Sequence, residues 1–239
     1  MRDYLLFIDT ETSGLPKNWD APYSKKENWP YAVQISWIIY TKEKQEVKRE
    51  NYYINNNDFT IASSAQKIHG ITPEFLAANG KRREEVMMLL KADLTHYQPM
   101  VVGHFIKLDF HVAGAEFYRT GMENPIKELP TFCTMLATTP LVKNPYKKYL
   151  RLCDLYELLF STPLNHQHHA LADAEATAAC FFELVNSGVI NDEKIREQES
   201  TLQKNNKMVT VNKNRTPVLV LILLTIIMIY FIWKAKFNF

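Results

Sequence analysis

Two acidic residues, Asp9 and Glu11, follow the apolar run Tyr4–Ile8 and are separated from each other by a single residue. The apolar run predicts a buried β-strand, and side chains two positions apart on a strand point to the same face. Two like charges about 4 Å apart repel by roughly 4 kcal/mol at an effective dielectric constant near 20. We therefore expect a partner that relieves this repulsion, and a bound metal ion would do so.

Two more segments place an acidic residue at the end of a predicted element. Asp109 lies at a strand-to-helix junction, and Asp173 lies in the first turns of a predicted helix. Each acid alone is usually a turn residue, a cap or a partner of the helix dipole. Together, four acids favour hard cations such as Mg²⁺ or Mn²⁺, and two such ions can clamp the attacking and the leaving oxygen of a phosphate displacement. Three histidines precede the last acid, namely His166, His168 and His169.

Composition and charge limit the class of protein. The chain has 239 residues, of which 46% are hydrophobic and 23% are charged. This suits one globular domain of about 180–200 residues with appendages. The net charge of +2 excludes a polycation, so nucleic-acid binding would depend on local basic patches or metal ions. The three cysteines form no C-x-x-C motif, which predicts neither disulfides nor a zinc finger and indicates a reducing compartment. The first residues lead directly into a strand, so no secretory signal peptide is expected.

The hydrophobic pattern predicts a mixed α/β fold over residues 1–186. Besides the first strand, strands are expected at Ala32–Thr41, Val47–Ile54 and Met100–Gly103. Amphipathic helices are expected over five further ranges: Thr72–Asn79, Arg82–Tyr97, Leu108–Arg119, Leu150–Phe160 and His169–Asn186.

The C-terminal part of the chain changes composition twice. Residues 187–216 are polar and predict a linker. Residues 217–239 contain the uncharged run Val218–Trp233, which as a helix would span about 24 Å, a little short of a ~30 Å hydrocarbon core. Tyr230 and Trp233 suit a membrane interface, so we expect a single C-terminal transmembrane helix that anchors a cytoplasmic domain. A buried C-terminal helix of the core is the alternative.

Three segments resemble the signatures of the DEDDh 3′–5′ exonucleases, the family that contains the proofreading epsilon subunit of bacterial DNA polymerase III. They are FIDTETSGL, GHFIKLDF and HHALADAEAT, and KIHGIT and TFCTMLATTP resemble further parts of the family in the same order. The resemblance covers about residues 4–186 and implies a ribonuclease H-like mixed sheet flanked by helices. The second segment departs from the family, which usually has Asn and Phe where this chain has Phe105 and Leu108.

The resemblance implies roles for the acids and for one histidine. Asp9, Glu11, Asp109 and Asp173 would hold two Mg²⁺ or Mn²⁺ ions, and His168 would be the general base. Five residues of a continuous helix rotate by about 500°, so His168 and Asp173 converge only if His168 lies in the loop before the helix. A histidine pKa of about 6.5 suits proton removal near neutral pH.

Other residues are candidates for contact with nucleic acid. The resemblance implies contacts to the terminal nucleotide by Thr12, Leu15 and His69, with core packing of Leu15 and a turn role of His69 as alternatives. The segment Asn144–Arg151 interleaves basic and aromatic residues, which suits either a guide for single-stranded nucleic acid or a solvated loop. Two histidines are expected to be bystanders, namely His166 and His169.

Together these features predict a membrane-tethered 3′–5′ exonuclease that hydrolyses nucleotides from the 3′ end of DNA. The same chemistry would suit an exoribonuclease acting on short RNA or RNA 3′ ends, because no contact to a 2′-hydroxyl can be placed. A catalytically dead nucleic-acid-binding or adaptor module is the alternative of another class, and retention of four acids with a histidine argues against it. The expected partners are 3′ ends, single-stranded at the site, and a membrane; a polymerase partner is possible but not indicated.

Overall fold

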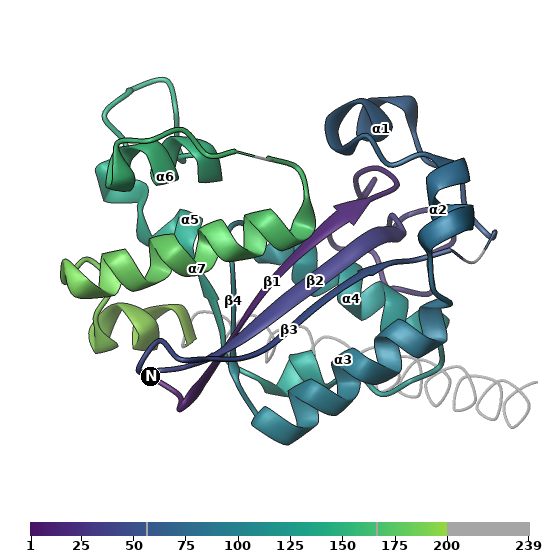
Figure 1. The fold of residues 1–239 in the computed structure, drawn as a ribbon, viewed down its shortest axis with the longest axis horizontal. Coiled ribbons are helices and arrows are strands. Elements are labelled where there is room, and N and C mark those ends of the chain that lie inside the picture. The colour runs from purple at the N-terminus through teal and green to yellow at the C-terminus, as the bar shows by residue number, and fades with distance from the viewer. Residues whose placement is uncertain (56, 166, 200–239) are drawn as a thin grey trace, which may run out of the picture. The chain divides into compact units, whose positions relative to one another are not determined.

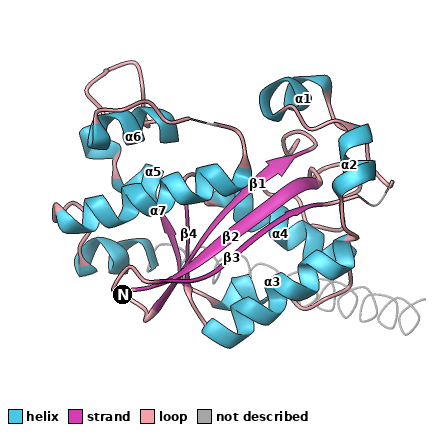
Figure 2. Cartoon of the chain, viewed as in Figure 1, coloured by secondary structure: helices cyan, strands magenta, loops and turns pink. Residues whose placement is uncertain are grey.

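A five-stranded sheet forms the centre of the domain, and helices cover both of its faces (Figures 1 and 2). The computed structural model describes residues 1–55, 57–165 and 167–199. The strands are β1 (Tyr4–Thr12), β2 (Ala32–Thr41), β3 (Glu46–Tyr53), β4 (Met100–Gly103) and β5 (Thr131–Cys133). Their order in the sheet is β3-β2-β1-β4-β5. The pairs β1–β2 and β2–β3 are antiparallel, whereas β1–β4 and β4–β5 are parallel, so the sheet is mixed.

Strand β1 lies in the middle of the sheet and contributes to a hydrophobic core on each side. Leu6 and Ile8 pack into one core, and Leu5 and Phe7 pack into the other. Successive residues of a strand face opposite sides, so a strand that is covered on both faces requires an unbroken apolar run. This requirement explains the apolar run at the start of the chain.

The acids Asp9 and Glu11 lie within β1, which continues beyond the apolar run. β1 pairs with β2 along this whole length, but it pairs with β4 only at Leu5–Phe7. The part of β1 that carries the acids therefore extends past β4. Other elements can bring side chains to this end of the strand.

Two pairs of helices cover the two faces of the sheet. Val86 and Phe117, from the first pair, pack into the core with Ile8. Leu155 and Phe181, from the second pair, pack into the opposite core. The first pair is α3 (Arg83–Tyr97) and α4 (Lys107–Arg119), and the second is α6 (Leu152–Phe160) and α7 (Ala170–Asn186).

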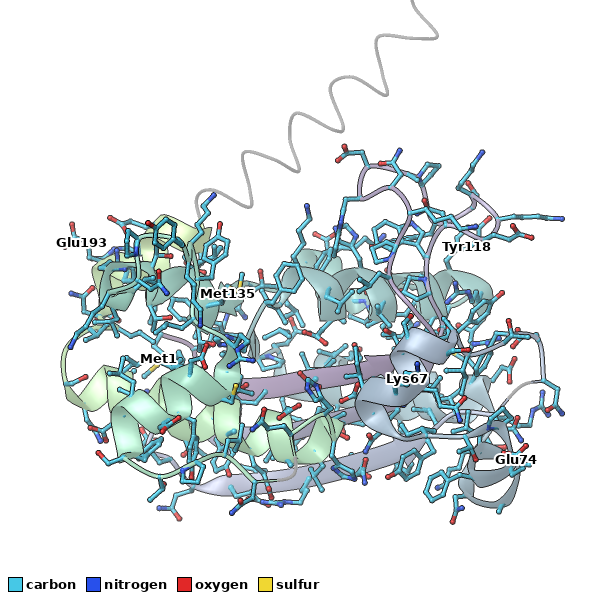
Figure 3. The ribbon with its side chains drawn as sticks, turned by 90° about the horizontal axis from the view of Figure 1, so that it is seen from above. Met1, Lys67, Glu74, Tyr118, Met135 and Glu193 are labelled. Carbon is cyan, nitrogen blue, oxygen red and sulfur yellow. The ribbon has the colours of Figure 1, made fainter. Side chains whose placement is uncertain are left out.

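Short helices complete the domain. They are α1 (Ser63–His69), α2 (Pro73–Asn79), α5 (Thr134–Ala137) and the 3₁₀ turns η1 (Pro125–Glu128) and η2 (Thr139–Leu141). Thr72 caps α2, because its hydroxyl accepts from the N–H of Phe75 at 3.1 Å. α1 lies close to the end of β1, and α6 lies above α7 (Figure 1). Lys67 of α1 and Glu74 of α2 lie at the opposite end of the view from Glu193 (Figure 3).

The fold class expected from the sequence is confirmed for the domain: a mixed sheet is flanked by helices. Each strand and helix that the hydrophobic pattern predicted is present, with ends that differ by a few residues. Elements that the pattern did not predict are short. α1 has no buried residue and β5 has three residues, so neither leaves a clear hydrophobic period.

The residues after α7 continue to pack on the domain. Ile190 and Ile195 are buried in the core beside α7, and residues 192–199 are helical. The compact unit runs from Met1 to Arg196, past the expected boundary at residue 186. In the part of the chain that the structure describes, no helix is long and apolar enough to cross a membrane. The predicted anchor at residues 217–239 lies outside the described residues.

Candidate active site

Four acidic side chains come together at the end of β1, and we call them the carboxylate cluster. Asp9 and Glu11 come from β1, Asp109 from the first turn of α4 and Asp173 from the first turn of α7. Glu11, Asp109 and Asp173 are buried, and Asp9 is partly buried. The fold thus brings together the four acids that the sequence indicated.

His168 lies beside the carboxylate cluster, in the loop before α7. One ligand atom of each of Glu11, His168 and Asp173 lies within 4.8 Å of the other two. The backbone N–H of His168 donates to Asp173 Oδ2 at 3.0 Å, and His168 has a left-handed φ of 63°. This backbone conformation keeps His168 off the helical path, so its ring can approach Asp173 from outside the helix. The structure places His168 in the loop, as the register argument required.

Asp109 is held by a hydroxyl from the strand that carries two of the other acids. Thr10 Oγ1 donates to Asp109 Oδ1 at 2.8 Å, and both groups are buried. β1 therefore supplies two acids and also the donor that orients a third. Sequence reasoning missed Thr10, because its partner lies 99 positions away and no local pattern joins the two.

Burial raises the pKa values of all four acids, and repulsion by neighbouring carboxylates adds to the rise for three of them. Burial, followed by the charges of Asp173 and Asp109, raises the pKa of Glu11 to about 8. Burial raises the pKa of Asp109 to about 7, although the hydrogen bond from Thr10 opposes the change. Burial and then the other three acids raise the pKa of Asp9 well above its ordinary value, and burial raises the pKa of Asp173. At neutral pH the cluster ionises fully only with added positive charge.

The donor set of the cluster fits a hard divalent cation. Carboxylate oxygens are the ligands that Mg²⁺, Mn²⁺ and Ca²⁺ prefer in proteins. The ion pairs formed within residues 1–55, 57–165 and 167–199 include none of the four acids. No lysine or arginine of these ranges therefore neutralises the cluster, and a divalent cation would supply the missing charge.

His169 contacts β2 and β3 instead of the carboxylate cluster. Its Nε2 lies 3.2 Å from the Tyr53 hydroxyl and 3.3 Å from the side-chain nitrogen of Gln34. Gln34 Oε1 also accepts from the N–H of Ala170 at 3.2 Å. These contacts attach the start of α7 to the sheet. His166 lies outside the described residues.

Thr12, Leu15 and His69 lie at or just beyond the end of β1. Leu15 is 74% exposed and does not pack in the core. The N–H of Ile71 donates to His69 Nδ1 at 3.0 Å, so the ring proton lies on Nε2, 3.2 Å from the carbonyl oxygen of Thr12. Burial lowers the pKa of His69, which favours this neutral form. His69 therefore ties the end of α1 to the end of β1, and the side chain of Leu15 is accessible to a ligand.

Two solvent-open clefts meet at His168. One, of about 340 Å³, is lined by Phe105, Tyr149, Arg151, His168 and Asp173 among others. The other, of about 450 Å³, is lined by residues that include His69 and His168. A ligand bound at the carboxylate cluster could therefore extend along either of these two clefts.

The segment Asn144–Arg151 borders the first cleft, and part of its positive charge is neutralised. Arg151 and Lys147 form ion pairs with Asp154 at 2.7 and 3.4 Å. Tyr146 of this segment is 97% exposed. The segment is thus a surface loop, and its last residues form one wall of the cleft.

Comparisons with known proteins agree with this geometry. Residues 6–181 match the exonuclease family RNase T, whereas none of the curated proteins matches. The fold is similar to that of E. coli Exonuclease I in complex with a dT13 oligonucleotide, with 20% identity and a TM-score of 0.63. The complex with a dA16 oligonucleotide gives 21% and 0.61, and each alignment covers 78% of this chain and 41% of Exonuclease I. The zinc-bound complex with single-stranded DNA gives 19% and 0.62, over 82% of this chain and 42% of that one.

This chain thus spans about two fifths of the length of Exonuclease I. At this level of identity the similarity shows a shared fold, the ribonuclease H-like α/β fold of exonucleases. The match to the RNase T family covers most of the domain and includes every member of the carboxylate cluster together with His168. The chain therefore belongs to the RNase T family of exonucleases.

Proposed function

We propose that this protein is a metal-dependent 3′–5′ exonuclease that hydrolyses nucleotides from the 3′ end of single-stranded DNA. The carboxylate cluster carries the proposal, because its four acids form no ion pair with a lysine or arginine among the described residues and lie beside His168 at an open cleft. Membership of the exonuclease family supports phosphodiester hydrolysis. The oligonucleotide complexes of Exonuclease I support single-stranded DNA as the substrate.

Asp9, Glu11, Asp109 and Asp173 would hold two Mg²⁺ or Mn²⁺ ions. When bound, the ions would stabilise negative charge on the attacking and the leaving oxygen of the phosphodiester. The Thr10 hydroxyl would keep Asp109 oriented toward the ions, as hydrogen-bond partners of metal ligands commonly do. An all-oxygen carboxylate set favours Mg²⁺ or Mn²⁺ over Zn²⁺, which prefers nitrogen and sulfur ligands.

His168 would act as the general base. Its ring lies close to Glu11 and Asp173, within reach of a water that attacks the terminal phosphodiester. The hydrogen bond from its backbone N–H to Asp173 holds it in place. The imidazole would take a proton from that water while the water oxygen attacks phosphorus. The P–O3′ bond would break, the 3′-oxygen of the shortened strand would take up a proton from solvent, and a nucleoside 5′-monophosphate would leave.

A directional assay with the full-length protein tests this proposal. Single-stranded DNA labelled at its 5′ end should give a descending ladder in Mg²⁺, and excess EDTA should stop the reaction. Cleavage of a circular single strand, or unchanged activity in EDTA, would contradict the proposal. RNA of the same sequence distinguishes an exoribonuclease, and binding of either strand without cleavage would indicate a non-catalytic binding module.

We also propose that residues 217–239 anchor the enzyme in a membrane with its domain in the cytoplasm. The run Val218–Trp233 has no charge, and basic residues are more numerous before it than after it, which favours a cytoplasmic N-terminal side. The full-length chain should resist carbonate extraction and lose its domain to protease added on the cytoplasmic side. A chain that ends at Thr216 should be soluble and active. A full-length chain that is soluble without detergent would refute the anchor.

A further inference from the structure

Phe105 combines an unusual backbone conformation with an exposed aromatic ring. It lies two residues after the end of β4 and has a φ of 69°, in the left-handed region that bulky residues rarely adopt. Its side chain is 37% exposed, so burial in the core does not account for a large apolar residue at this position. Strained positions that present a side chain to a cleft are frequently functional.

The ring of Phe105 packs against a group of other aromatic residues. Trp19 meets it edge-to-face, with ring centroids 5.8 Å apart. Trp19 belongs to the segment between β1 and β2, and the Trp29 ring of the same segment stacks on His111 of α4 at 4.7 Å. The Tyr23 hydroxyl lies 3.1 Å from His111 Nδ1. This packing holds the ring of Phe105 in place before any ligand binds.

Phe105 lies in the cleft that leads to the carboxylate cluster, and cations lie on the same cleft or beside it. His168 and Asp173 line the cleft with Phe105, and Arg151 is on its wall. Lys107 is exposed, and its ammonium group lies 4.8 Å from the ring centroid of Trp19. A fixed aromatic face beside cations is the arrangement by which proteins stack single-stranded bases and hold their phosphates.

We propose that Phe105 stacks on an unpaired base of the substrate strand, next to the phosphodiester that is cleaved. This inference rests on the proposed function, because it identifies the occupant of the cleft as the strand whose end lies at the carboxylate cluster. Stacking requires a face and not a pattern of donors and acceptors, so the contact is tolerant of sequence. It requires an unpaired base, so Phe105 favours single strands over duplex ends.

Two substitutions separate the effect of the Phe105 ring from the effect of the backbone conformation. Phe105→Asn removes the stacking face and introduces a residue that tolerates the left-handed region, so the fold should be as stable as the wild type or more stable. Phe105→Tyr keeps the face and should retain activity. Tyr118→Asn is the matched control, since Tyr118 is an exposed aromatic residue at the far end of α4, outside the cleft lining.

A double-mutant cycle, which combines substitution of Phe105 with removal of one base from the substrate, provides the test. The substrates are a single-stranded oligonucleotide and three versions with one abasic unit at the first, second or third position from the 3′ end. For the full-length wild type, one abasic position should weaken binding, measured by anisotropy, and lower kcat/KM on the order of tenfold. Phe105→Asn should show a similar loss on the intact strand and no further loss at that abasic position. Phe105→Tyr and Tyr118→Asn should behave as the wild type.

Equal losses for the wild type and Phe105→Asn at every abasic position would overturn the stacking contact, even if cleavage is normal. Failure of the proposed function alone gives a different result. The strand would then stay intact, while the abasic unit would still weaken binding by the wild type and not by Phe105→Asn. A protein that neither binds nor cleaves the strand would refute both.

Discussion

Two clusters of charged side chains lie in this domain, and they differ in whether their acids are paired with basic residues. The carboxylate cluster gathers four acids without a lysine or arginine partner among the described residues. In the second, which we call the arginine–glutamate cluster, Glu116 is fully buried and lies between two arginines, with Oε1 2.7 Å from Arg119 and Oε2 2.5 Å from Arg83. Arg83 also donates two hydrogen bonds to Asp58, at 2.7 and 2.8 Å. This cluster has two acids and two bases.

The contacts of the two clusters explain the difference. Arg119 donates to the carbonyl oxygens of Trp29 and Pro30 at 2.6 and 3.0 Å, and Glu116 accepts from the N–H of Ala32 at 2.8 Å. The arginine–glutamate cluster therefore fixes the chain where it enters β2. The acids of the carboxylate cluster make few such contacts and repel one another. Buried charge that is compensated within the chain serves the fold, whereas buried charge that is not compensated predicts a ligand of opposite sign.

Substitution in the carboxylate cluster should give the largest effect on activity. Asp109→Asn keeps the shape of the side chain and an acceptor for Thr10 but removes a charge that would hold metal. Activity should fall by about 10⁴-fold, the upper end of what one acid–base group supplies, because the ions act on both reacting oxygens. Steady-state rates and thermal unfolding in EDTA check this. The unfolding temperature should rise, since a buried repulsive charge is lost. A fall would contradict the conclusion that the charges of the carboxylate cluster are uncompensated within the chain.

Substitution of His168 separates proton transfer from charge balance. His168→Ala should lower kcat by about 10²–10⁴-fold, because the proposed general base is lost. Binding of Mn²⁺, measured by calorimetry, should remain, since the acids are intact. His169→Ala is the control and should affect activity far less, because His169 contacts Tyr53 and Gln34. An inactive His169 variant beside an active His168 variant would reverse the assignment.

Substitution in the arginine–glutamate cluster should affect the fold and leave the chemistry unchanged. Glu116→Gln leaves the buried Arg83 and the partly buried Arg119 without their shared negative charge, which should cost about 3–5 kcal/mol and lower the unfolding temperature by roughly 6–20 °C. Glu123→Gln removes an exposed acid 3.8 Å from Lys91 and should cost less than about 1 kcal/mol. Activity per folded molecule at low temperature should match the wild type. A large loss there would mean that this cluster also serves the site.

The pH dependence of stability tests the carboxylate cluster without any substitution. In EDTA the folded state holds protons on Glu11 and Asp109 up to pKa values of about 8 and about 7, whereas the unfolded chain loses them near 4.5 and 3.8. The folded state therefore binds more protons in this window, and stability should fall as the pH rises from about 4.5 to about 8. A fall of at least about 1.4 kcal/mol corresponds to one pKa unit. Denaturant titrations check it, and saturating Mg²⁺ should remove the trend. The same trend with and without Mg²⁺ would contradict a metal site here.

The sequence predicted the parts of the fold and site that leave a local pattern. β1 and α7 were predictable because long apolar runs and helical periods report burial directly. The acids and His168 were predictable because each lies at the end of such an element. The role of Thr10 and the pairing of Arg83 with Glu116 were not, since each joins residues that are distant in the chain. The left-handed backbone of Phe105 was not predictable either, because φ depends on its neighbours in space.

The central position of β1 has a consequence for how the site fluctuates. The amide hydrogens of β1 that pair with β2 and β4 should exchange with solvent only when the whole domain unfolds. His168 lies outside any helix or strand, and its amide should exchange through local opening. Asp9 and Glu11 would therefore stay in place for as long as the domain is folded, while His168 would have a local opening equilibrium of its own. Mild denaturant should then slow catalysis at concentrations that leave metal affinity unchanged.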